Sequence, residues 1–183
     1  MNITKTLPVL ALSLVLFGCA SGTKYENLAY TETTGLTFDS ALKSQVGVSP
    51  VQGGSKTNPL WKSQISNEAF QKALKSSLAS QGLLSPTGRY QLSTNLDKVE
   101  QPLMGFDFVV WTYVTYKLTD GQSGKVVMSE QIVTPYKATM GDSVIGLKRL
   151  RMATEGSGKN NIQSFLEKLA KLDISAGDVS LVN

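Results

Sequence analysis

Two pairs of carboxylates come closest to a catalytic arrangement in this chain: Asp97 with Glu100, and Asp107 with Asp120. A glycosidase-like reaction needs two such acids facing one cleft, one to donate a proton and one to attack or to activate water. Each of these acids also suits a strand end or a turn, and we favour that interpretation. The chain contains no histidine, which removes Ser-His and Cys-His nucleophile pairs and the usual imidazole zinc sites. We therefore expect a protein that is not an enzyme, with no catalytic residue, no metal and no cofactor.

A second candidate for chemistry is the segment Gly156-Ser157-Gly158-Lys159. A phosphate-binding P-loop needs a glycine five positions before the glycine that precedes the lysine, and a Ser or Thr after the lysine. Those places hold Ala153 and Asn160, and no apolar strand leads into the segment. We expect no nucleotide site here.

The single cysteine, Cys19, follows an apolar N-terminal run. Lys5 supplies a positive charge ahead of residues 7–17 (LPVLALSLVLF). At about 1.5 Å per helical residue this run is too short to span a hydrocarbon core of about 30 Å. We interpret residues 1–18 as a signal peptide that is removed on export.

The end of this run, Leu16-Phe17-Gly18-Cys19, resembles a bacterial lipobox. The resemblance implies cleavage before Cys19, a diacylglycerol thioether on that residue, and usually a further acyl chain such as palmitate on the new amino group. Two or more acyl chains hold a protein stably on a membrane without a transmembrane helix. Ala20 stands where an aspartate resembles an inner-membrane retention signal, so the resemblance implies the outer membrane, with the domain facing the periplasm. The alternative is an ordinary secretory signal with a chance cysteine.

The remaining chain has the length of one domain. Removal of residues 1–18 from the 183 leaves 165 residues, enough for a single hydrophobic core. Loss of Lys5 lowers the formal net charge from +4 to +3, and the lysines are scattered, so we expect no nucleic-acid partner. We assign residues 19–36 to the lipidated cysteine and a flexible tether, and 37–183 to one α+β domain.

The pattern of apolar residues predicts the elements of this domain. In order, they are a strand over 45–51, a helix from an N-cap at Ser66 to Gly82, strands over 90–96, 106–119 and 125–134, and helical periodicity over 144–150 and 162–172. Gly156 and Gly158 are expected to interrupt the last two stretches, with one continuous bent helix as the open alternative. This order predicts an α+β two-layer sandwich, a mainly antiparallel sheet with two or three helices on one face.

The same order behind a lipobox resembles the YajG-type and LptE-type small lipoproteins. Three segments also resemble recurring segments of an uncharacterised proteobacterial lipoprotein family: Asn58-Pro59-Leu60-Trp61, Met104-Gly105-Phe106-Asp107 and Arg149-Leu150-Arg151-Met152-Ala153. That family brings no activity with it, and no functional residue is carried over.

Side chains alternate along the strand over 106–119. One face carries Phe106, Phe108, Val110, Val114, Tyr116 and Leu118, and we expect the apolar side chains of both helices, including Leu74 and Phe165, to pack on Phe108, Val110 and Val114. The opposite face then carries Val109, Trp111 and Tyr113, which would form an exposed patch for a partner or an acyl chain. The alternative is that the tether, the loop at Trp61 or a helix covers them.

Cationic side chains gather near the start of the C-terminal region, at Lys148, Arg149, Arg151 and Lys159. Such a cluster fits the phosphates of lipid A or of phospholipids. A solvated helix face is the alternative.

Together these features favour an anchored, non-catalytic protein that acts by binding, as an accessory of an envelope assembly with an unidentified envelope protein as its partner. A lipid or glycan carrier that uses the uncovered sheet face is the alternative, and an envelope hydrolase is less favoured. A flat apolar patch would support the first, and a deep apolar cavity the second.

Overall fold

The computed structural model describes residues 22–33, 35–58, 62–174 and 180–181. The predicted signal peptide, Cys19 and Trp61 lie outside them. The elements in chain order are α1 (Tyr25–Leu28), the 3-10 helix η1 (Ser40–Leu42), β1 (Val46–Val48), α2 (Asn67–Ser80), β2 (Tyr90–Glu100), β3 (Phe108–Asp120), β4 (Val126–Ala138), α3 (Gly146–Leu169), β5 (Leu172–Asp173) and β6 (Ser180–Leu181).

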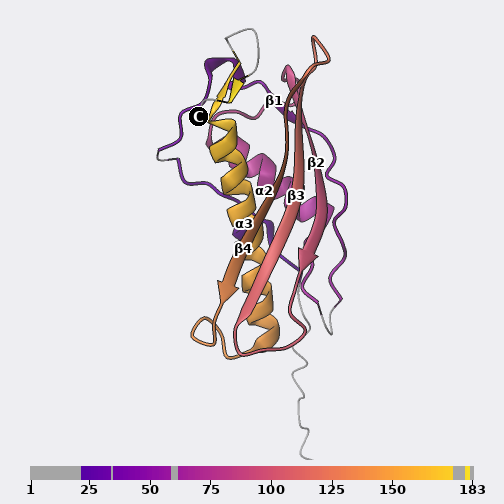
Figure 1. Cartoon of the computed structure of the whole chain (residues 1–183), viewed down its shortest axis with the longest axis vertical. Helices are drawn as coiled ribbons and strands as arrows, with labels where there is room; N and C mark the ends of the chain where they lie inside the picture. Colours follow the sequence, from indigo (N-terminus) through magenta and orange to yellow (C-terminus); the bar gives the residue numbers. More distant parts are fainter. Residues whose placement is uncertain (1–21, 34, 59–61, 175–179, 182–183) are drawn as a thin grey trace, which may run out of the picture.

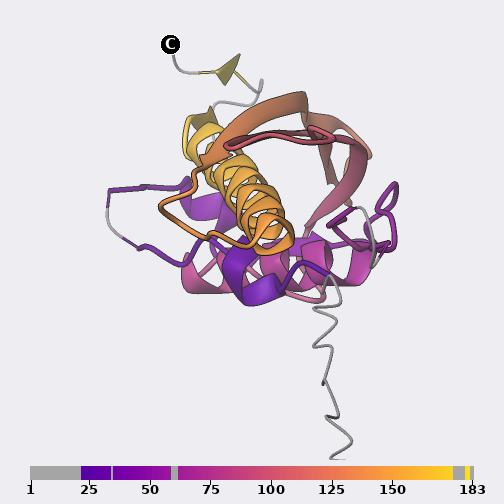
Figure 2. The ribbon, with the colours of Figure 1, turned by 90° about the horizontal axis from the view of Figure 1, so that it is seen from below.

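Four strands form the main sheet, in the order β1-β2-β3-β4 (Figure 1). β3 is antiparallel to both β2 and β4, whereas the short β1 runs parallel to β2. The sheet curves around α3, and α1 and α2 lie on the same side (Figure 2). β5 and β6 pair separately. The predicted α+β class, with helices on one face of a mainly antiparallel sheet, is confirmed.

α2 begins and ends where its sequence predicts. The Ser66 hydroxyl accepts a hydrogen bond from the Ala69 amide at 3.1 Å, which satisfies one free donor of the first turn. Gly82 has a positive φ of 69°, and the amide of Leu83 donates to the carbonyl of Leu78 at 2.9 Å. This pattern is a Schellman motif, which requires a left-handed residue after the helix.

α3 is one continuous helix of 24 residues, so the expected interruption at Gly156 and Gly158 is wrong and the continuous alternative is correct. Both glycines allow close packing. A Cβ at Gly156 would lie 2.4 Å from Cγ of Tyr136 on β4, and one at Gly158 would lie 2.5 Å from a methyl of Leu28 on α1. The absence of a side chain therefore brings neighbouring elements close, and that packing outweighs the low helix propensity of glycine.

The apolar core has two parts. The larger one joins α2 to the sheet and to the C-terminal half of α3, where Phe165 stacks on Tyr116 with ring centroids 4.3 Å apart. The smaller one contains Phe108, Val110 and Ala138 of the sheet, with Leu150 and Ala153 of the first turns of α3. The expectation that α2 and Phe165 pack on Phe108 and Val110 is therefore wrong, because β3 extends past the region that α2 covers.

Buried polar side chains also join α3 to the sheet. The Ser157 hydroxyl donates to the Thr134 carbonyl on β4 at 2.8 Å and accepts from the Thr112 hydroxyl on β3 at 2.7 Å. The Asn161 amide donates to the carbonyls of Thr112 and Ile132 at 3.0 and 2.9 Å, and its oxygen accepts from the Tyr116 hydroxyl at 2.9 Å. Because each group is paired, burying it carries little penalty, and the contacts fix the position of α3 along the strands.

The prediction of a flexible tether over 19–36 is wrong for residues 25–30. Tyr25–Leu28 form α1, and Leu28, Ala29 and Tyr30 are buried in the larger core. The Tyr30 amide donates to the buried hydroxyl of Ser77 on α2 at 2.9 Å. The surrounding sequence is polar and rich in threonine, so its composition did not indicate that three apolar side chains in it belong to the core.

Candidate functional site

The outer face of the sheet carries the aromatic side chains predicted from strand alternation. On β3, the side chains from Phe108 to Leu118 at even positions are buried, and the odd positions face away from the helices. Trp111 and Val109 are each 40% exposed, and Tyr113 is half-buried. No described segment covers Trp111. β3 begins at Phe108, so the expected place of Phe106 on the inner face is wrong, and Phe106 is exposed.

Neighbours on β4 extend this surface. Val133 lies opposite Tyr113, and Pro135 opposite Trp111, and both are exposed. Opposite residues of an antiparallel pair point to the same side of the sheet. We call Val109, Trp111, Tyr113, Val133 and Pro135 the outer-face patch. It is centred on β3, an interior strand, so it is an open surface with sheet on both sides.

Carboxylates border the outer-face patch on β2. The Tyr113 hydroxyl donates to Glu100 at 2.9 Å, and Lys98 pairs with the same carboxylate. The hydrogen bond from Lys98, followed by that from Tyr113, lowers the pKa of Glu100.

Asp97 continues this border on the same sheet face. Burial raises its pKa, but hydrogen bonds from Thr115, Gln131 and Asn95 outweigh that effect and lower the pKa below its usual value. A glycosidase acid needs a raised pKa so that it carries a proton at neutral pH. Asp97 and Glu100 are both held in the ionised form, which fits side chains that bind and disfavours a general acid.

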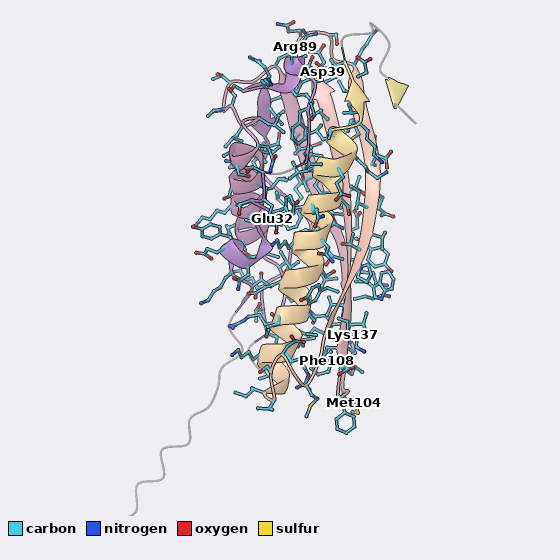
Figure 3. All side chains as sticks on the ribbon, turned by 90° about the vertical axis from the view of Figure 1, so that its left-hand side faces the viewer. Glu32, Asp39, Arg89, Met104, Phe108 and Lys137 are labelled. Carbon is cyan, nitrogen blue, oxygen red and sulfur yellow. The ribbon has the colours of Figure 1, made fainter. Side chains whose placement is uncertain are left out.

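The second predicted acid pair is not a pair in space. Asp120 forms an ion pair with Arg89 at 2.7 Å, whereas Asp107 pairs with Lys137 at 2.8 Å. Arg89 and Lys137 lie at opposite ends of the molecule (Figure 3). The 13 residues of β3 separate the two acids by roughly 40 Å. Asp107 and Asp120 therefore face no common cleft.

The predicted cationic cluster is largely engaged inside the protein. Arg149 is only 4% exposed, and its guanidinium donates to the carbonyl of Ser143 at 2.6 Å. Arg151 is half-buried beside Glu155 at 3.7 Å, and Lys159 pairs with Glu32 at 3.4 Å. Lys148 is exposed. The prediction of a surface phosphate ligand is wrong for Arg149, because its apolar surroundings and its carbonyl partners take it out of solvent.

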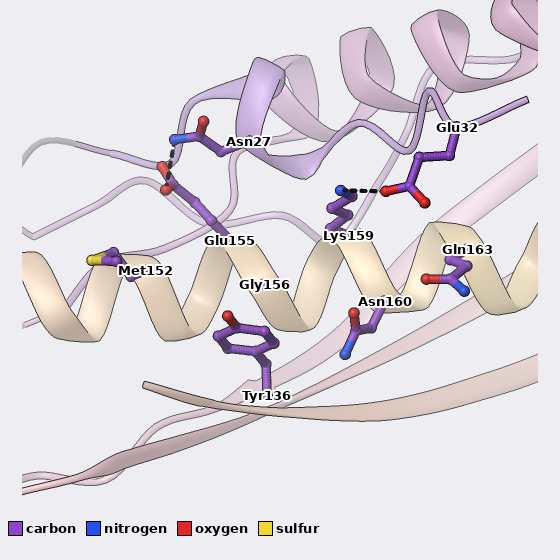
Figure 4. Close-up of a pocket in the computed structure, with 9 residues that line it drawn as sticks. All are labelled: Asn27, Glu32, Tyr136, Met152, Glu155, Gly156, Lys159, Asn160 and Gln163. Atoms are coloured by element: carbon purple, nitrogen blue, oxygen red, sulfur yellow. Dashed lines mark hydrogen bonds and ion pairs between the residues drawn. The ribbon is translucent and has the colours of Figure 1, made fainter. Parts of the chain in front are cut away.

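A groove of about 430 Å³ runs along α3 beside the edge strand β4 (Figure 4). Its polar side chains mostly satisfy one another: Glu155 accepts from the Lys24 amide at 2.9 Å and from the Asn27 side chain at 2.8 Å, and Asn160 donates to the Pro135 carbonyl at 3.1 Å. The ring of Tyr136 lies under Gly156. This groove is open and most of the residues that line it are polar, unlike the deep apolar cavity that an acyl carrier needs.

No family model and no curated protein sequence matches the chain significantly. Solved structures do match. Protein XCC0632 from Xanthomonas campestris, of the DUF330 family, is 12% identical, covers 72% of this chain and 88% of its own, and has a TM-score of 0.52. A minor lipoprotein from Acinetobacter baumannii is 10% identical, with 70% and 93% covered and a TM-score of 0.47. PelC from Paraburkholderia phytofirmans, a dodecamer, is 18% identical, with 71% and 95% covered and a TM-score of 0.42.

The chain shares the fold of XCC0632. Bacterial lipoproteins are among the other solved structures that it matches. The resemblance to YajG-type and LptE-type proteins stays a prediction. Within the described ranges, no helix is long and apolar enough to cross a membrane, and no group of three His, Cys, Asp or Glu side chains could hold a metal ion.

Sequence reasoning missed one surface, at the end of the molecule where β2 leads into β3 and β4 into α3. Leu103, Met104, Phe106, Val144 and Ile145 are all exposed there. The sequence does contain a signal that could have indicated this exposed surface: large apolar residues occur near the turn formers Pro102, Gly105 and Gly141. Phe106 fits the alternation of the predicted strand and Val144 fits the predicted helical stretch, so neither pattern indicates that these side chains are exposed.

Proposed function

We propose that this chain is an envelope lipoprotein, anchored to the outer membrane through lipid on Cys19, that acts by binding a partner protein through the outer-face patch. The support for the anchor is the lipobox-like sequence that ends at Cys19, followed by Ala20. The support for binding is the exposure of Trp111 on an interior strand, where a free aromatic side chain is normally covered by protein or used at an interface. The domain faces the periplasm and performs no catalysis.

The outer-face patch has the anatomy of a small docking surface. Apolar groups lie at its centre, and the charged side chains of Lys98 and Glu100 lie at its border. Trp and Tyr dominate the binding energy of many interfaces because each buries a large area with little loss of side-chain freedom. An open surface of this kind fits a folded protein better than a single acyl chain, which needs an enclosed cavity.

Photo-crosslinking in intact cells tests this proposal. A benzophenone amino acid placed at position 111 or 133 should give one protein adduct of the same size from both positions. Position 75 is the matched control, because Lys75 is an exposed residue of α2 on the other side of the sheet. Adducts of equal yield from all three positions, or lipid adducts alone from positions 111 and 133, would contradict a protein partner at the outer-face patch.

The double variant Trp111→Ser and Tyr113→Ser should abolish the adduct formed from position 133. Trp111 and Tyr113 lie outside both parts of the apolar core, so the thermal midpoint should move by only a few degrees. A large fall in the midpoint would show that both rings belong to the core, and an unchanged adduct would place the binding surface elsewhere.

A further inference from the structure

One end of the molecule presents apolar side chains to solvent. Leu103, Met104 and Phe106 lie in the connection from β2 to β3, and Val144 and Ile145 lie in the connection from β4 to α3. All five are between 62% and 93% exposed. We call them the apolar tip; Figure 3 shows Met104 at this end. Large exposed apolar side chains gathered on two loops mark a surface that something else covers.

A buried arginine of α3 holds the two loops of the apolar tip together. Arg149 of α3 donates to the carbonyl of Ser143 in one loop at 2.6 Å and to that of Gly105 in the other at 3.3 Å. Its guanidinium lies 4.8 Å from the ring centroid of Phe108. A buried cation that bonds two loops at once fixes them relative to each other, because releasing either loop leaves a donor without a partner. The tip is therefore a built surface on a rigid base.

The start of the described chain lies close to this end. The Lys24 amide donates to Glu155, and Gly22 lies against the Thr57 side chain. Glu155 is nine residues into α3 from Gly146, which places the tip end of the helix about 14 Å away at 1.5 Å per residue. The other end of α3, Leu169, is about 21 Å from Glu155 in the opposite direction.

The chain before Lys24 is long enough to reach the tip end of α3 but not its other end. Cys19 is five residues before Lys24, and five residues reach at most about 17 Å when fully extended. From the level of Glu155, that length exceeds the distance of about 14 Å to the tip end of α3 and falls short of the distance of about 21 Å to Leu169. Acyl chains on Cys19 can therefore enter a bilayer at the tip end of the domain and not at the opposite end.

We propose that the apolar tip inserts into the lipid boundary of the membrane that holds the acyl chains of Cys19. This inference rests on the proposed lipid anchor. Apolar side chains of peripheral proteins bury about 5–10 Å into the boundary between headgroups and acyl chains. Lys148, exposed in the first turn of α3 directly behind Ile145, then lies at the level of the lipid phosphates. The insertion holds the long axis of the domain upright and directs the opposite end away from the membrane.

Site-specific fluorescence tests this arrangement. Cys19 is the only cysteine of the chain, and acylation blocks its thiol, so an introduced cysteine can be labelled alone. The lipidated protein is reconstituted in vesicles of phosphatidylethanolamine and phosphatidylglycerol, with the dye NBD at Phe106→Cys or Val144→Cys. Gln122→Cys is the matched control, an exposed loop position at the far end of β3.

The emission maximum of NBD at positions 106 and 144 should shift to the blue, and most of the emission intensity should be quenched when the vesicles contain a doxyl-labelled lipid. NBD at position 122 should show neither the shift nor the quenching. Vesicle flotation is recorded on the same samples. A chain that floats with unquenched probes at 106 and 144 overturns the inference alone. A blue shift without doxyl quenching also overturns it, because a protein surface then covers the tip. A chain that does not float overturns the lipid anchor, and the inference with it.

Discussion

Gly156 of α3 packs directly against Tyr136 of β4, and a single methyl group there should reveal how tightly the helix and the sheet are packed. A Cβ at this position would lie 2.4, 2.5 and 2.6 Å from three atoms of the Tyr136 ring, each well inside van der Waals contact. In a helix interior, Gly→Ala stabilises by about 1 kcal/mol. Overpacking costs about 1–3 kcal/mol. We therefore expect Gly156→Ala to lower the free energy of unfolding by about 1 kcal/mol.

The sign should reverse when the ring is removed. A Tyr136→Ala background removes the three atoms nearest to the new methyl group, so Gly156→Ala should then stabilise by about 1 kcal/mol, which gives a coupling energy of about 2 kcal/mol between the two positions. Urea titrations at constant slope measure the four variants. Gly146→Ala is the control, because its Cβ would have nothing within 4 Å. A Gly156→Ala variant that is equally stabilising with and without the Tyr136 ring would refute the close contact.

Three further changes test the anchor, the core and an ion pair. Cys19→Ser should remove palmitate labelling and membrane attachment together while the domain stays folded, and a variant that stays in the membrane fraction would contradict the lipid anchor. Leu74→Ala, at a fully buried position, should cost about 2–5 kcal/mol in chemical denaturation; an unmoved midpoint would mean that α2 does not cover the core. The hydrogen bond from Arg89 holds the pKa of Asp120 far below its ordinary value. The Arg89–Asp120 pair therefore stabilises the fold fully at any pH above the unfolded pKa of about 3.9, and this stabilisation is lost as the pH falls from there toward the folded pKa. Asp120→Asn should flatten the acid side of the stability profile, and an unchanged profile would argue against that pair.

Elements with local signals could be predicted from the sequence. α2 has a serine cap, an apolar stripe and a terminal glycine within 17 residues, and each signal acts on its near neighbours. The alternation along β3 likewise identified the face of Trp111, because side-chain direction in a strand depends only on position. These local rules were sufficient for the fold class and for the three residues of the outer-face patch on β3; Val133 and Pro135 were added by the pairing of β3 with β4.

Features that depend on distant residues could not be predicted in the same way. The local sequence predicts that Gly156 breaks the helix, because the packing of Tyr136, 20 residues earlier, against it is not visible in that sequence. The local sequence predicts that Arg149 is a surface cation. In the structure the carbonyls of Ser143 and Gly105 and the ring of Phe108 enclose its guanidinium. Phe106 continues an apolar alternation and yet lies outside the strand, since the end of pairing depends on β4. In each case tertiary contacts overrode a local preference.

The buried hydrogen bonds between α3 and the sheet determine how the domain carries mechanical load. A pull on the anchored end passes through Lys24 and Asn27 to Glu155, and so into α3. To slide toward the tip, α3 must break the contacts of Ser157 and Asn161 with β3 and β4 together, because the two residues lie about one turn apart along α3 and their hydrogen bonds run across from the helix to the strands. Bonds loaded in shear share the force, whereas bonds opened from one end break singly. The domain is thus built to resist tension from its own tether.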